Sequence, residues 1–168
     1  IVTFDFSIGV ALAMVSAFLI CGAGQAINDI FDYKIDKKIN KKKPIPSGKV
    51  SRSNATIFSA ILFLVGIILA FFINPLAFTI AVIFSILLIL YASVLYKVKY
   101  LGNIVVALGT AFTFIFGASV TETIPLLIII FAMSAFFANM SREITKDFED
   151  LKKDKGFKKT LPMISKKL

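Results

Sequence analysis

The chain has 168 residues, of which 58% are hydrophobic, and its 19 basic and 10 acidic residues give it a net charge of +9. Soluble domains hold roughly 45–50% apolar residues, so this composition excludes an ordinary soluble protein. A single cysteine and no histidine exclude an intrachain disulfide and argue against zinc and haem sites.

Long apolar segments follow one another along the chain. The runs 57-IFSAILFLVGIILAFFI-73 and 76-LAFTIAVIFSILLILYASVLY-96 carry no charge, and each can cross a hydrocarbon core of about 30 Å as a helix. Asn74-Pro75 separates these runs, and Pro125 suits the start of the last segment. The pattern predicts five spans, at about residues 7–33, 53–73, 76–96, 101–120 and 124–146. We expect an all-α, polytopic transmembrane helical bundle that forms one membrane-embedded domain over residues 1–168.

Small residues recur every four positions in the first span. Gly9, Ala13, Ala17 and Cys21 predict a stripe that permits close helix contact. We expect Gly24 to let a neighbouring backbone or a substrate approach closely.

The basic residues fall in three places: the 34–52 connection, the 97–99 turn, and the stretch from Arg142 onward. Alternating spans put all three on one side of the membrane, and basic loops favour the cytoplasm. We therefore expect a multi-pass protein of the cell membrane with its active site at the cytoplasmic face. Orientation, or attraction to anionic lipid, would explain the basic residues. It does not explain why most of the acidic residues lie at the same edge.

Two groups of acidic side chains end predicted spans at this edge. Asn28, Asp32 and Asp36 are spaced four apart, which puts them on one stripe of a helix. The second group has helical spacing as well and consists of Asp147, Asp150 and Asp154. Like charges at this spacing repel, and Mg²⁺, which prefers carboxylate and phosphate oxygens, would relieve that repulsion. Two such groups predict a pair of Mg²⁺ ions with a pyrophosphate between them.

Basic residues near both groups would meet the remaining phosphate oxygens. They are Lys43, Lys97, Lys99, Arg142 and Lys146. The alternative for either acidic group is a solvated helix end with surface salt bridges, each worth about 0–1 kcal/mol. The presence of two groups on one membrane face favours metal binding.

At these residues the chain resembles the UbiA-type intramembrane prenyltransferases. Asn28-Asp29-x-x-Asp32-x-x-x-Asp36 is similar to the first signature of that family, NDxxDxxxD, and Asp150-x-x-x-Asp154 to the second, DxxxD. The segments 43-KPIPSGKVS-51 and 156-GFKKTLP-162 resemble family segments that follow the two signatures, and 91-YASVLYKVK-99 resembles a loop that closes over the diphosphate.

The resemblance implies an enzyme that moves an isoprenyl group from a diphosphate donor to an acceptor, with two Mg²⁺ ions holding the diphosphate. It implies metal ligands at Asn28, Asp32, Asp36, Asp150 and Asp154, with Asp29 and Asp147 as supports, Asp147 being a further candidate ligand. The implied catalytic residues are Asp32, Asp36, Asp150, Asp154 and Lys97. The implied substrate-binding residues are Asn28, Lys43, Tyr96, Lys97, Lys99, Arg142 and Lys146.

The family bundle has about nine spans, so the resemblance implies that the five predicted here form part of one. Within the family, 44-PIPSGKVS-51 and 142-REITKDFEDLKKD-154 most resemble the archaeal digeranylgeranylglyceryl phosphate synthases. That likeness implies geranylgeranyl diphosphate as donor and geranylgeranylglyceryl phosphate, a lipid phosphate, as acceptor. We expect membrane lipids but no nucleic acid as further partners; the sequence does not predict an oligomeric state.

Three alternatives stay open from the sequence. One is a family member that uses an aromatic, quinone-type or chlorophyll-type acceptor. Another is a CDP-alcohol phosphotransferase, although the chain lacks the Asp-Gly pair of that pattern and its acids lie in two distant segments. The third is a cation transporter, which would carry its acids near the bilayer midplane rather than at the edge.

Overall fold

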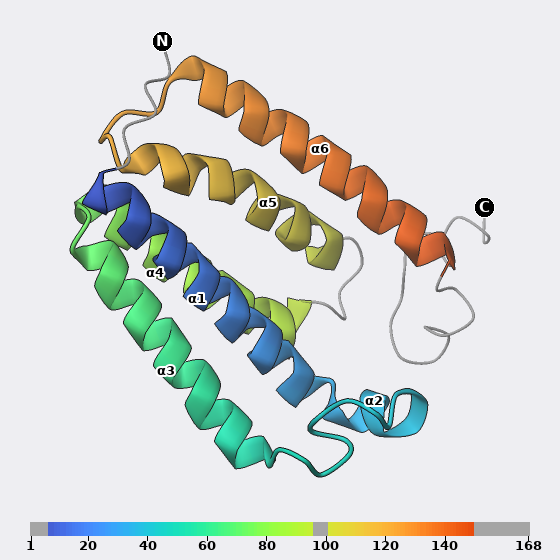
Figure 1. Cartoon of the computed structure of the whole chain (residues 1–168). Helices are drawn as coiled ribbons and strands as arrows, with labels where there is room; N and C mark the ends of the chain where they lie inside the picture. Colours follow the sequence, from blue (N-terminus) through green and yellow to red (C-terminus); the bar gives the residue numbers. More distant parts are fainter. Residues whose placement is uncertain (1–6, 96–100, 150–168) are drawn as a thin grey trace. The chain divides into compact units, whose positions relative to one another are not determined.

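The computed structural model describes residues 7–95 and 101–149, and this part of the chain is helical (Figure 1). The helices are α1 (Ile8–Phe31), α2 (Tyr33–Ile39), α3 (Arg52–Phe71), α4 (Pro75–Ser93), α5 (Leu101–Ser119) and α6 (Leu126–Glu149). All except the short α2 are long and apolar enough to cross a membrane, which confirms the five predicted spans. The chain divides between Ala92 and Ser93 into two compact units, each described by itself.

In the first unit, α1 and α3 pack against each other as antiparallel neighbours (Figure 1). The hydroxyl of Ser16 donates to the carbonyl of Gly66 at 2.8 Å, and that of Ser59 donates to the carbonyl of Ala23 at 3.0 Å. Both serines are buried, so each hydrogen bond satisfies a polar group that lipid could not. A Cβ on Gly66 would lie 2.7 Å from Ile20 Cγ1, so the glycine permits this close approach.

The stripe predicted on α1 was wrong in part. Ala13 is buried, but Cys21 is exposed, and α1 buries Ser16, Ile20 and Ala23 instead. A spacing of four overshoots the helical turn of 3.6 residues, so a strict four-residue stripe winds away from a fixed neighbour. The observed face mixes spacings of three and four and therefore stays in register with α3.

The breaks between helices follow the local sequence. Asn74 accepts a hydrogen bond from the Ala77 amide at 2.8 Å, and Pro75 begins α4. Gly24 faces α4, since a Cβ there would lie 2.9 Å from Leu88 Cδ1, so the predicted close approach involves a leucine side chain.

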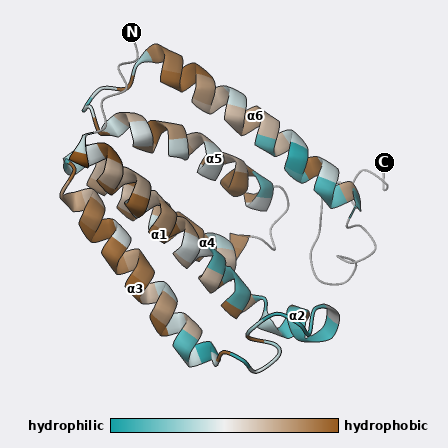
Figure 2. Ribbon diagram, viewed as in Figure 1, coloured by the Kyte–Doolittle hydropathy of each residue, from teal (hydrophilic) through white to brown (hydrophobic). Residues whose placement is uncertain are grey.

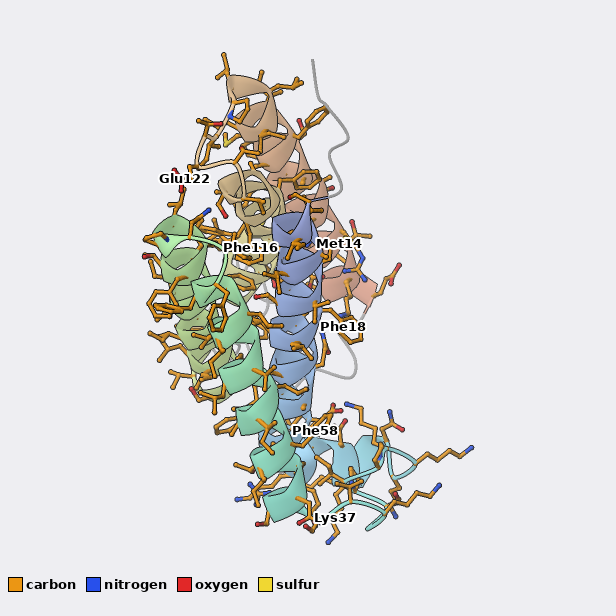
Figure 3. All side chains as sticks on the ribbon, turned by 60° about the vertical axis from the view of Figure 1, so that its left-hand side comes forward. Met14, Phe18, Lys37, Phe58, Phe116 and Glu122 are labelled. Carbon is orange, nitrogen blue, oxygen red and sulfur yellow. The ribbon has the colours of Figure 1, made fainter. Side chains whose placement is uncertain are left out.

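The outer surface of this unit is apolar along the helices and polar at one end. Figure 2 shows hydrophobic residues along α1 and α3, and hydrophilic residues on α2 and the adjoining end of α3. Met14, Phe18 and Phe58 extend from α1 and α3 with 60%, 77% and 57% of their surface exposed (Figure 3). Exposed side chains of this size suit contact with lipid or with further apolar segments.

The second unit is the pair α5 and α6, joined by a turn that contains Glu122 at φ 58°. Asn139 on α6 donates to the hydroxyl of Thr110 and to the carbonyl of Val106 on α5. Nearer the end of α6, Asn103 on α5 donates to Asp147 on α6 at 2.8 Å. Two sets of interhelical hydrogen bonds, about two helical turns apart, therefore fix the register of this hairpin.

Candidate active site

The first acidic group lies at the junction of α1 and α2. Asp32 ends α1 and precedes α2, with φ −77° and ψ −2°. Its amide donates to the carbonyl of Asn28, and its own carbonyl accepts from the amide of Asp36, both at 2.9 Å. The predicted helix thus divides at Asp32 into α1 and α2. These two hydrogen bonds nevertheless keep the four-residue helical spacing through the junction.

Lys43 joins one carboxylate of this group, that of Asp36, to the neighbouring carboxylate of Asp29. Its Nζ donates to Asp29 Oδ1 and to Asp36 Oδ2, each at 2.8 Å. Asp36 is buried, while Asp29 and Lys43 are partly exposed. Burial by itself lowers the pKa of Lys43, but the hydrogen bonds and charges of the two aspartates outweigh it and raise the pKa above the ordinary value. Lys43 is therefore a fixed cation within the acidic group.

The turns of residues 43–50 hold Lys43 in place. The Ser47 amide donates to the Lys43 carbonyl at 3.0 Å, and the Gly48 amide donates to the Ile45 carbonyl at 3.1 Å. Gly48 has φ +79°, a left-handed conformation that glycine adopts without strain. Ile45 packs with Ile30 of α1 and Ala55 of α3, so an apolar cluster anchors this polar segment to both helices.

Tyr33, at the start of α2, extends the same cluster towards basic residues. It packs against Ile30, Ile45 and Ala55, and its ring faces Arg52 Cζ at 5.3 Å and Lys37 Nζ at 5.6 Å. The Arg52 contact ties α2 to the first turn of α3, whereas the Lys37 contact lies within α2.

In the second unit, Asp147 is the described member of the second acidic group. It is buried with 9% of its surface exposed, and its Oδ2 accepts the hydrogen bond from Asn103. Arg142 and Lys146 are exposed, and Arg142 pairs with Glu143 at 2.8 Å. The other predicted site residues lie outside the described part of the chain: Tyr96, Lys97, Lys99, Asp150 and Asp154.

The sequence did not single out two of these contacts. It predicted a phosphate-binding role for Lys43 but not its bonds to both Asp29 and Asp36. It did not identify Asn103, which stands out in the sequence only as a polar side chain near the start of an apolar span. These partners could not be chosen without the fold, because the contacts join residues 7, 14 and 44 positions apart, beyond the three- or four-residue spacing of neighbours on one helix.

The chemistry of the donor set fits Mg²⁺, which binds oxygen ligands. The first group offers the carboxylates of Asp32 and Asp36 and the amide oxygen of Asn28. In residues 7–95 and 101–149, no three His, Cys, Asp or Glu side chains form a group that could hold a metal by itself.

Comparison with known proteins agrees with the motifs. The UbiA prenyltransferase family matches residues 3–167. A curated digeranylgeranylglyceryl phosphate synthase from Methanococcus aeolicus is 46% identical over 147 residues, covering 88% of this chain and 52% of that protein. Its counterpart from Methanosphaera stadtmanae is 39% identical over 165 residues, covering 98% and 60%. The chain thus spans only about half to three fifths of these relatives.

Solved structures show the same fold. A structure described as digeranylgeranylglyceryl phosphate synthase in membranes superposes with a TM-score of 0.83 at 36% identity, over 95% of this chain and 58% of that one. A UbiA homologue from Archaeoglobus fulgidus, bound to GPP and Mg²⁺, gives a TM-score of 0.82 at 21% identity, which shows the fold alone. The family match and the identities of the curated relatives together show that the chain belongs to the UbiA prenyltransferase family.

Proposed function

We propose that this chain carries the diphosphate-binding part of a Mg²⁺-dependent prenyltransferase that makes archaeal ether lipids. The donor would be geranylgeranyl diphosphate and the acceptor geranylgeranylglyceryl phosphate. The observation that carries the proposal is the set of Asn28, Asp32 and Asp36 at the end of the apolar helix α1, with Lys43 held between Asp36 and the adjacent Asp29. The names and identities of the curated relatives support the choice of donor and acceptor.

In the reaction, the bond between C1 of the geranylgeranyl chain and the diphosphate oxygen breaks, and an allylic carbocation forms. The acceptor hydroxyl oxygen bonds to C1, its proton leaves, and the products are the diether and pyrophosphate. Two Mg²⁺ ions, when bound, would neutralise charge on the departing pyrophosphate.

We assign metal binding to both acidic groups: Asn28, Asp32, Asp36, Asp147, Asp150 and Asp154. Asp32, Asp36, Asp150, Asp154 and Lys97 are the proposed catalytic residues. The phosphates of donor and acceptor would contact Asn28, Lys43, Tyr96, Lys97, Lys99, Arg142 and Lys146. The basic residues of the 34–52 connection support a cytoplasmic position for this end of the protein.

The assay combines the purified protein with geranylgeranyl diphosphate, geranylgeranylglyceryl phosphate and Mg²⁺. We expect ether formation that chelation of Mg²⁺ abolishes, and a loss of roughly 10–100-fold or more in Asp32→Ala and Asp150→Ala. Glu122→Asn is the control, because it removes an acid in the α5–α6 turn and asparagine tolerates the positive φ at that position. Full activity in both aspartate variants would refute the assigned site, and activity on an aromatic acid alone would refute the acceptor.

A further inference from the structure

Asp147 is a buried carboxylate with a neutral partner. Its surface is 9% exposed, and its hydrogen bond comes from the Asn103 side-chain amide at 2.8 Å. Among residues 7–95 and 101–149, Asp147 makes no ion pair, whereas Asp29 and Asp36 share the ammonium of Lys43. A buried carboxylate is stable only when a cation or several donors compensate its charge. One amide donor satisfies one oxygen and leaves the negative charge in place.

The contact between Asn139 and Thr110 provides an internal comparison. It joins the same two helices through neutral groups, and Asn139 also reaches the carbonyl of Val106 at 3.3 Å. Such a contact is complete without any further ligand, so it serves helix pairing alone. The contact between Asn103 and Asp147 differs because one member carries a charge and lies within one helical turn of Asp150 in sequence.

We propose that Asn103 is a positioning residue: by binding Oδ2 of Asp147, it fixes the carboxylate so that Oδ1 is presented to a divalent cation. This inference rests on the proposed Mg²⁺–diphosphate site and assigns a role to a residue outside its motifs. Because the side-chain amide is neutral, it can donate a hydrogen bond to one carboxylate oxygen without repelling or replacing a cation bound at the other. Partners that orient a metal ligand in this way commonly change metal affinity 10–100-fold when they are removed.

The competing explanation is that Asn103 only holds α5 to α6. Matched variants separate the two roles: Asn103→Leu and Asn139→Leu each remove an interhelical hydrogen bond from the same hairpin. Cation affinity is measured on the purified protein in lipid nanodiscs with Mn²⁺ as probe, by electron paramagnetic resonance in the presence of pyrophosphate. Thermal unfolding is measured on the same samples.

We expect both variants to lower the melting temperature, whereas only Asn103→Leu weakens Mn²⁺ binding, by about tenfold. Asn103→Gln, which retains the amide, should recover part of that affinity. Equal Mn²⁺ affinity in Asn103→Leu and Asn139→Leu would overturn the proposal.

Measurements on the wild-type protein separate this inference from the proposed function. Tight Mn²⁺ binding without prenyl transfer would reject the proposed reaction and leave the role of Asn103 intact. Prenyl transfer with unchanged Mn²⁺ affinity in Asn103→Leu would reject the positioning role and leave the reaction intact. If the wild-type protein binds no Mn²⁺, both fail.

Discussion

Lys43 is the residue that connects the polar 40–51 segment to the acidic end of α1. Replacement by methionine would leave Asp29 and the buried Asp36 without their shared cation. We expect Lys43→Met to lower the free energy of unfolding by about 2 kcal/mol, the scale of a hydrogen bond to a charged group. Lys42→Met is the matched control, because Lys42 is adjacent and exposed. Thermal unfolding of both variants in detergent tests this, and equal melting temperatures would contradict it.

The same ion pairs determine a pH dependence. Because the two aspartates raise the pKa of Lys43 in the folded protein, its contribution is complete below the ordinary lysine pKa of about 10.4. It is lost as the pH rises through the folded-state pKa. The difference in melting temperature between the wild type and Lys43→Met should therefore stay constant from neutral pH to about pH 9 and shrink only in stronger alkali. A difference that closes between pH 7 and 9 would show that Lys43 acts in another way.

At the scale of elements, the pairing of α1 with α3 depends on Gly66. A methyl group there would lie 2.7 Å from Ile20 Cγ1 and 3.2 Å from the Ser16 carbonyl, so α1 would have to move and stretch the hydrogen bond between Ser16 and Gly66. We expect Gly66→Ala to destabilise the protein by about 1–3 kcal/mol, as overpacking usually does. Gly117→Ala is the control: its added methyl meets no atom within 4 Å, and alanine favours the helix by about 1 kcal/mol. A Gly66→Ala protein that melts at or above the wild-type temperature would disprove this account.

The sequence predicted helix positions more accurately than helix contacts. Charge-free length and breakers such as Asn74-Pro75 are local properties, and accordingly α3 ends at Phe71 and α4 begins at Pro75. Which side chains meet depends on register, and a constant spacing of four, as in Gly9 to Cys21, does not follow the helical turn. For the candidate site, the sequence predicted the acidic residues and Lys43 as members. The break at Asp32, the double pairing of Lys43 and the partner of Asp147 needed the folded chain.

For the whole molecule, the distribution of charge predicts how the chain crosses the membrane. Three apolar helices, α3, α4 and α5, separate the basic 40–51 segment from the turn at residues 121–125, so we expect the two on opposite sides of the membrane. From the positive-inside rule we propose a cytoplasmic position for the basic segment. That position would give the proposed site access to diphosphates made in the cell, and it can be measured without any activity assay.

In a Cys21→Ala background, Lys41→Cys and Thr123→Cys introduce single exposed thiols on either side of that boundary. We expect a membrane-impermeant maleimide to label the Thr123→Cys protein in intact cells and the Lys41→Cys protein only in inverted vesicles. Labelling of both proteins in solubilised samples shows that each thiol is reactive. Because an odd number of crossings separates the two positions, labelling of both from the same side would contradict the five-span assignment. The reversed pattern would keep the spans and put the acidic ends of α1 and α6 outside the cell, away from the proposed donor.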